Sequence, residues 1–127
     1  MTDQEAWQPI SREALQGEVS GGVGRMSPEQ RRLWDAVSIT PEKWQQEPYG
    51  KEGGGFWVVA LLGPNVVWYN DIEEGFNCSR YSNYGTIDEY GCNQDELEWA
   101  IQALLNLIMT GQNAGSFGPP ESLALPS

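Results

Sequence analysis

The chain of 127 residues contains no histidine and only two cysteines, Cys78 and Cys92. Without imidazole, the commonest general base and nitrogen ligand is missing, so chemistry would have to rest on carboxylates, hydroxyls and thiols. The two cysteines form no Cys-x-x-Cys pair, and a zinc site made of thiolates is therefore not expected. Reduced thiols in a cytosol fit this usage best, while a Cys78 to Cys92 bridge stays open as an alternative.

Positive charge and long apolar runs are also scarce. Seven Lys and Arg stand against 18 Asp and Glu, which gives a formal net charge of −11. Such a field repels nucleic acid and anionic membranes and attracts basic proteins. The longest apolar run, Phe56 to Leu62, is far shorter than the roughly 20 residues that span a bilayer. The first seven residues carry acids and no apolar segment follows them, so we expect no secretion signal and a cytoplasmic location.

The length suits a single domain. We expect residues 1–26 to form a loosely ordered arm, residues 27–112 the globular core and residues 113–127 an irregular tail. Within the arm, Ser11 is placed to cap a short helix over Arg12–Gln16, and the glycines of Ser20–Gly24 are typical of a flexible linker.

Capping signals predict the helices. Ser27–Gln30 combines a Ser cap with Pro at the first helical position and Gln three residues after the cap, so a helix is expected to about Val37. The same signals at Thr40–Lys43 predict a helical turn, with Trp44 pointing inward.

The C-terminal helix has the clearest pattern. It is predicted to begin after a cap at Asn93 and to end at Gly111. Its apolar residues recur at helical spacing and form one core-facing stripe: Leu97, Ala100, Ile101, Leu104, Leu105 and Ile108.

The middle of the chain predicts strands. Phe56–Leu62 is apolar without alternation, which favours a central strand covered on both faces. Val66–Tyr69 follows after a short turn as the second strand of an antiparallel hairpin, and Phe76–Tyr81 alternates as a third. Thr86–Tyr90 is a candidate for a fourth. The expected class is α+β: an antiparallel sheet of three to four strands, a C-terminal amphipathic helix on one face and short N-terminal helices.

Acidic and aromatic side chains gather between Asp71 and Glu98, where eight carboxylates accompany a single cation, Arg80. Carboxylates attract basic groups from a distance, and exposed aromatic rings give stiff contact area. Trp68 and Tyr69 are neighbours on a predicted strand, so one of them should face outward. Trp34, Trp44, Trp57 and Trp99 are predicted as core or boundary residues. The expected partner-binding set is Trp68, Tyr69, Asp71, Glu73, Glu74, Tyr81, Tyr84, Asp88 and Glu89.

Two chemical alternatives use the same acids. Asp71 and Glu73 would share one face of a strand, as a pair of carboxylates for glycoside hydrolysis must. Asn70, Asp71, Glu73 and Asn77 could offer oxygen atoms to Ca²⁺, but the spacing of a calcium-binding loop is absent. We therefore predict no catalytic residue, no metal and no cofactor.

The run Trp68-Tyr-Asn-Asp-Ile-Glu-Glu-Gly-Phe-Asn77, together with Phe56–Gly63, Gly85–Tyr90 and Gln94–Trp99, resembles small acidic bacterial immunity proteins of polymorphic toxin systems. The resemblance covers about half of the chain. It implies a cytosolic, non-enzymatic protein that binds and neutralises a cognate basic toxin, such as a nuclease, by stoichiometric contact. The alternative is a DNA mimic or adaptor that occupies a basic nucleic-acid-binding surface. A carboxylate-dependent hydrolase is less favoured.

Overall fold

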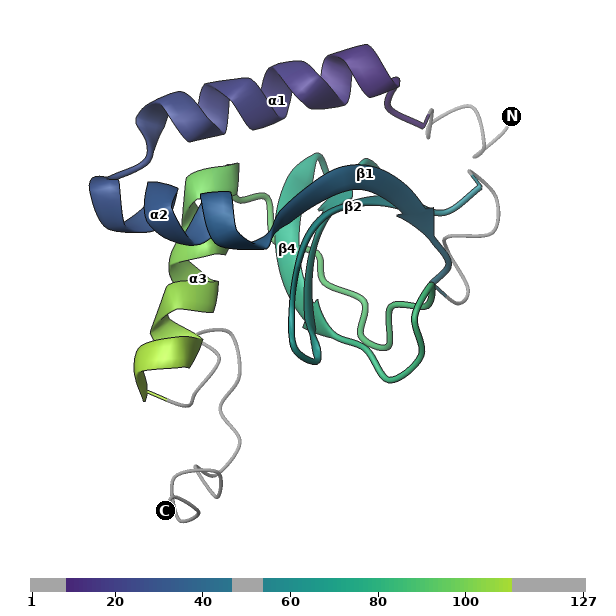
Figure 1. Cartoon of the computed structure of the whole chain (residues 1–127). Helices are drawn as coiled ribbons and strands as arrows, with labels where there is room; N and C mark the ends of the chain where they lie inside the picture. Colours follow the sequence, from purple (N-terminus) through teal and green to yellow (C-terminus); the bar gives the residue numbers. More distant parts are fainter. Residues whose placement is uncertain (1–8, 47–53, 111–127) are drawn as a thin grey trace.

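Three helices and four strands build the described part of the chain, residues 9–46 and 54–110 of the computed structural model (Figure 1). The expected α+β class, with an antiparallel sheet and a C-terminal helix packed on it, is confirmed. In chain order the elements are α1 (Arg12–Arg25), α2 (Pro28–Val37), β1 (Ser38–Trp44), β2 (Phe56–Leu62), β3 (Asn65–Asn70), β4 (Gly75–Arg80) and α3 (Leu97–Thr110). The expected tail at 113–127 and the first eight residues of the arm lie outside the described residues.

The strands form one antiparallel sheet in the order β1-β2-β3-β4. β2 is therefore internal, as its unbroken apolar sequence predicted, and Leu62 pairs with Asn65 across the expected tight hairpin. Residues 40–43 were expected to form a helical turn, which is wrong. They belong to β1, where pairing with β2 outweighs the local capping signal and the register shifts between Ser38 and Glu42. Trp44 is buried, as expected.

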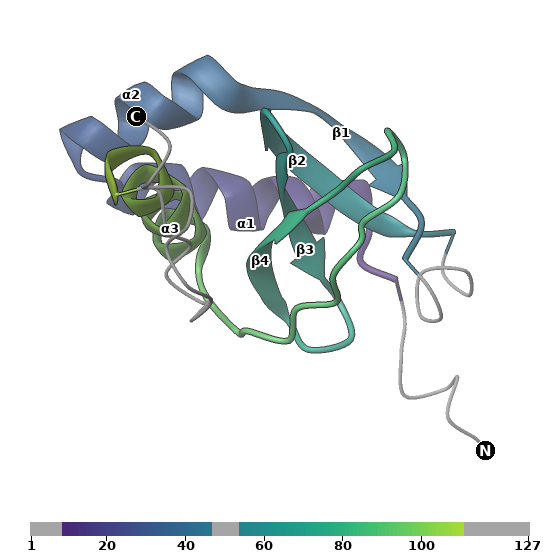
Figure 2. The same ribbon diagram turned by 90° about the horizontal axis from the view of Figure 1, so that it is seen from below.

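The sheet curls until its two edge strands are joined by one segment. Gln45, just after β1, forms a parallel bridge with Thr86, and the Ile87 amide donates to the Gln45 carbonyl at 2.8 Å. The Asp88 amide donates to the carbonyl of Arg80 in β4 at 3.0 Å. Figure 2 shows this segment crossing the open side of the sheet. Thr86–Tyr90 is thus not a regular fourth strand, because its backbone bonds are divided between two edges.

Each face of the curled sheet has its own apolar cluster. Inside the curl lie Trp44, Phe56, Val58, Val66, Trp68 and Ile87, all at most 1% exposed. The outer face packs against the helices through residues that include Val59, Val67, Tyr69, Phe76, Leu97, Ile101 and Leu104. Both faces of the central strands are therefore removed from water, which stabilises the fold through buried apolar area. None of the described helices is long and apolar enough to cross a membrane.

The N-terminal region is more ordered than its glycines suggested. Instead of a short helix followed by a linker, α1 runs through Ser20–Gly24 to Arg25, and Leu15 is completely buried. Gly22 explains the difference, since it lies where α1 crosses α3. A Cβ built at Gly22 would be 2.6 Å from Cβ of Leu97. Glycine serves here as a residue small enough for close helix packing.

The other two helices agree with their expected positions, with one correction. α2 has the complete capping box, with Gln30 N donating to Ser27 Oγ and Ser27 N donating to Gln30 Oε1. α3 begins at Leu97, so Asn93 is not its cap. Asn93 N instead donates to Asn77 Oδ1, a tertiary bond that the local pattern could not reveal. The expected end at Gly111 lies outside the described residues, and the helix is described as far as Thr110.

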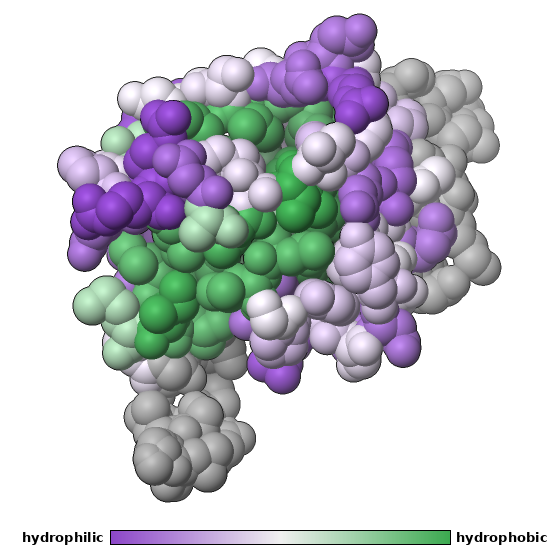
Figure 3. Space-filling model, in the orientation of Figure 1, coloured by the Kyte–Doolittle hydropathy of each residue, from purple (hydrophilic) through white to green (hydrophobic). Residues whose placement is uncertain are grey.

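One face of the molecule carries apolar surface. Figure 3 shows hydrophobic residues over α3 and between α3 and α2. At the end of α3, Ile108 is 52% and Met109 69% exposed. The predicted stripe of this helix is thus buried at Leu97, Ile101 and Leu104 but partly exposed at its C-terminal end.

We expect Gly22→Ala to lower the free energy of unfolding by about 1–3 kcal/mol, because the new methyl group must push α1 away from Leu97. Gly17→Ala is the matched control, since a Cβ there meets nothing within 4 Å. It should stabilise the protein by roughly 0.5–1 kcal/mol through helix propensity. Urea denaturation followed by circular dichroism measures both, and equal effects at the two positions would contradict the packing role of Gly22.

Candidate functional site

Trp68 and Tyr69 do not provide the outward ring that the sequence predicted. Trp68 is completely buried inside the curl, where its Nε1 donates to Ser79 Oγ at 3.0 Å. Tyr69 points to the other face and is only 7% exposed. The expectation that one neighbour faces solvent is wrong because helices cover one face of β3 and the segment after β4 covers the other.

The acidic turn between β3 and β4 is held in shape by Asn70. Its Oδ1 accepts hydrogen bonds from the amides of Ile72 and Glu73, at 2.9 and 3.1 Å. Glu74 adopts a positive φ of 64°, which closes the turn. Asp71 is half-buried, and its Oδ2 accepts from the Ile10 amide at 2.8 Å, so it also fastens the segment before α1. Glu73 and Glu74 are left to present their carboxylates at the end of the sheet.

Carboxylates from three elements converge near Tyr69. Burial raises the pKa of Tyr69 to about 12, and the charges of Glu18, Glu74, Asp71 and Glu96 add to the rise. Glu18 comes from α1, Asp71 and Glu74 come from the turn, and Glu96 directly precedes α3. No described residue hydrogen-bonds the Tyr69 hydroxyl. We call Glu18, Asp71, Glu74 and Glu96 with Tyr69 the acidic end.

Cations also lie in this region. Arg12 and Lys43 stand over the ring of Trp57, the cross-strand neighbour of Tyr69. Arg25, at the end of α1, donates to Glu98 Oε2 and Glu96 Oε1, each at 2.8 Å. The Glu98 side chain is only 7% exposed, whereas that of Glu96 is 55% exposed. Arg25 therefore offsets the charge of the buried Glu98. It also binds Glu96, whose side chain stays in contact with solvent.

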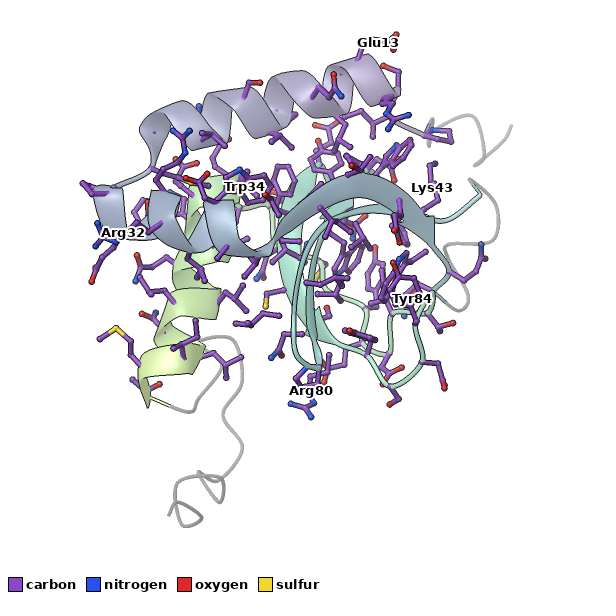
Figure 4. The ribbon with its side chains drawn as sticks, viewed as in Figure 1. Glu13, Arg32, Trp34, Lys43, Arg80 and Tyr84 are labelled. Carbon is purple, nitrogen blue, oxygen red and sulfur yellow. The ribbon has the colours of Figure 1, made fainter. Side chains whose placement is uncertain are left out.

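The other predicted residues lie elsewhere, so the expected single acidic patch is divided. Tyr84 is 65% exposed, but its ring contacts that of Trp44 at a tilt of 54°, and its hydroxyl donates to Glu42 Oε1 at 2.6 Å, beside β1. Tyr81 contacts the same tryptophan edge-on at 4.9 Å. Asp88 accepts from Ser82 near Arg80. Figure 4 places Arg80 and Tyr84 on the half of the molecule away from α1.

Glu89 stands at the opposite end of β4 from the acidic turn. Its Oε1 accepts from the Arg80 amide at 3.1 Å. The five residue steps from Gly75 to Arg80 separate these two acidic positions by about 16 Å of strand. The sequence could not show this separation, because the chain returns along β4 after residue 88.

A groove of about 790 Å³ lies between β4, the segment after it and α3. Glu89 and Asp95 are among its lining residues, and so are Cys78, Tyr90, Cys92 and Trp99. Asp71 and Glu73, the pair considered for hydrolysis, do not line it. We call it the β4 groove. It begins beside the acidic end, where Asp95 precedes Glu96, and it extends along the strand to Glu89.

Asparagine side chains create the groove. Residues 88–95 run back along β4 and touch it at both ends, through the Asp88 amide at Arg80 and the Asp95 carbonyl at Phe76. Between these contacts Asn77, 2% exposed, holds Asn93 through two hydrogen bonds of 2.9 and 3.1 Å. Asn70 Nδ2 donates to the Gly91 carbonyl at 2.8 Å. These bonds hold the returning segment away from the edge of β4.

Trp99 and Glu18 are functional candidates that the sequence analysis missed. Trp99 was predicted as a core or boundary residue, but it is 56% exposed and lines the groove. The signal was present, since Trp99 is not part of the apolar stripe of α3 and shares a helix face with Ala103 and Asn106. Glu18 had no such signal, because its region was expected to be a loosely ordered arm.

In the described part of the chain the thiols and carboxylates form no metal site. Cys78 and Cys92 are both free. Burial raises the pKa of the Cys78 thiol to about 11, which makes it a poor nucleophile at neutral pH. Among the described residues no group of three or more Cys, Asp or Glu side chains could hold a metal ion.

The raised pKa of Tyr69 predicts that the protein loses stability at alkaline pH. Tyr69 should ionise at about 12, above its usual 10, so the folded state holds this proton more tightly than the unfolded state. Stability should therefore fall as the pH rises from 10 towards 12, and Tyr69→Phe should reduce that fall. Urea denaturation across this range measures the change. In NMR of ring-labelled tyrosine, Glu18→Gln with Glu74→Gln should lower the Tyr69 pKa; an unchanged value would show that these acids do not converge.

No protein-family model, curated protein or solved structure matches this chain.

Proposed function

We propose that this protein is a non-enzymatic acidic binding protein that neutralises a basic protein by one-to-one contact, as an immunity protein neutralises its cognate toxin. The observation that carries the proposal is the gathering of acids from three elements around Tyr69, beside a groove with an exposed tryptophan. Hydrogen bonds from Ile10 to Asp71 and from Arg25 to Glu96 tie the two ends of α1 to this group of acids. Acids far apart in the sequence are thus brought to one end of a fold whose net charge is already −11.

The two parts of the site have different roles in this mechanism. Carboxylates at the acidic end attract a basic partner and raise the association rate constant. At low salt this attraction can lift the constant to about 10⁸ M⁻¹s⁻¹. The ring of Trp99 then provides apolar contact area and a face for a guanidinium group, which slows dissociation. A toxin that acts on nucleic acid has a basic cleft, so contact at this site would also block its substrate.

The alternative of a DNA mimic or adaptor uses the same charge differently. A mimic of duplex DNA should present rows of acids that follow two phosphate backbones. Glu18, Asp71, Glu74 and Glu96 form one cluster at the acidic end, and Asp88 and Glu89 lie apart from it at the other end of β4. The cluster favours a compact protein contact. Capture of a DNA-binding host protein would support the alternative instead.

The test begins with the tagged full chain as bait in its native cell. We expect a basic protein to be recovered, to form a one-to-one complex, and to lose its activity at equimolar ratio. Recovery of acidic proteins only, or a complex that leaves the partner fully active, would contradict the proposal.

Charge removal at the turn gives a quantitative prediction. Glu73→Gln with Glu74→Gln should lower the association rate with the captured partner about three- to tenfold at low salt, and should make that rate less dependent on salt. The matched control is Glu29→Gln with Asp35→Asn, which removes the same charge from exposed positions on α2. Stopped-flow kinetics at several salt concentrations measures both pairs, and an equal loss in both would show that only net charge matters.

A further inference from the structure

The outer edge of β4 has an interruption in its hydrogen bonding at Cys78. The Phe76 amide donates outward to Asp95, and the Arg80 amide donates outward to Glu89. Because backbone groups alternate along a strand, the amide and carbonyl of Cys78 must also point away from β3. No hydrogen bond joins them to the returning segment or to any other described residue.

This open position faces the β4 groove. Cys78 lines the groove together with residues of α3 and of the returning segment. The strand between the contacts at Phe76 and Arg80 is four residue steps long, or about 13 Å. That length admits a short extended segment of another chain, but not a long strand.

The charged and polar side chains that line the groove indicate what kind of segment it binds. Glu89 and Asp95 stand near its two ends, Trp99 forms part of its wall, and Asn93 and Asn106 add polar atoms. Backbone pairing at an exposed sheet edge is a common way to bind peptides, with affinity from the main chain and specificity from flanking side chains. Carboxylates at both ends favour Arg or Lys on either side of the paired residue.

We propose that the β4 groove binds an extended basic segment of the partner, whose central residue pairs with the backbone of Cys78 while flanking cationic side chains meet Glu89 and Asp95. The inference rests on the proposed function, since it assigns the element of the basic partner that enters the site. It requires no covalent step and no reaction of the thiol.

The free protein already gives one measurable consequence. The Cys78 amide should exchange its hydrogen at least about tenfold faster than the amides of Asn77 and Ser79, which pair with β3. Amide exchange followed by NMR measures all three. Equal protection at Cys78 would show that its amide is already bonded and would overturn the inference. Protection that grows with protein concentration would indicate pairing between two copies, which also overturns it.

The binding test uses the full chain and a synthetic peptide, acetyl-Arg-Val-Thr-Val-Arg-amide. We expect saturation with this peptide to slow exchange at Cys78 by at least about tenfold. Methylation of the central Thr nitrogen removes the donor to the Cys78 carbonyl and should weaken binding about tenfold, as loss of one hydrogen bond would. Replacement of both Arg by Glu should abolish binding.

Side-chain variants test the walls of the groove. Trp99→Ala should weaken the peptide about tenfold, whereas Met109→Ala, also exposed on α3 but outside the groove lining, should not. Glu89→Gln with Asp95→Asn should weaken it, and Glu29→Gln with Asp35→Asn should not. Equal binding of the methylated and unmethylated peptides would overturn the inference. If the captured partner is inhibited in a complex in which hydrogen exchange at the Cys78 amide is not slowed, the proposed function stands and this inference fails.

Discussion

The buried side-chain amide of Asn77 is the interaction on which the shape of the site depends. It satisfies both backbone groups of Asn93 from within the sheet, while Asn70 holds the Gly91 carbonyl nearby. Had residues 89–94 bonded to the edge of β4 directly, they would have completed a fifth strand and filled the groove. A Cβ at Gly91 would collide with the Asn77 side chain, so the glycine is part of the same arrangement. Both asparagines are almost fully buried, and loss of either amide would leave backbone groups without partners.

The acidic end is built by a different set of constraints. Gly22 lets α1 approach α3, and this contact brings Glu18 towards the turn between β3 and β4. Arg25 then pairs with Glu96 and Glu98 across the two helices. The fold therefore brings like charges together at one end while it retains one cation against the buried carboxylate. Such a cluster opposes folding through self-repulsion, which is a cost that a partner-binding surface can justify.

Much of the fold could be predicted because its signals are local. The capping box of Ser27, the apolar run of β2, the tight hairpin at Leu62 and the core-facing stripe of α3 each depend on residues close in sequence. The sequence predicts the wrong element where contacts between distant residues decide the structure. Residues 40–43 form part of β1 because β2 pairs with them.

The candidate site was predictable in composition but not in arrangement. The acids of the turn were identified, yet Glu89 proved to be a strand's length away, and Trp68 was covered by a segment whose return path no local pattern encodes. Bridging of the two sheet edges by residues 85–88 has a further consequence for the behaviour of the protein in a crowded cell. Unpaired strand edges are templates for fibril growth, and here the edge of β4 is occupied on both sides of Cys78. The position that we propose for recognition is thus also the point on β4 where a stray strand could attach, and the surrounding negative charge keeps other copies of this chain away from it.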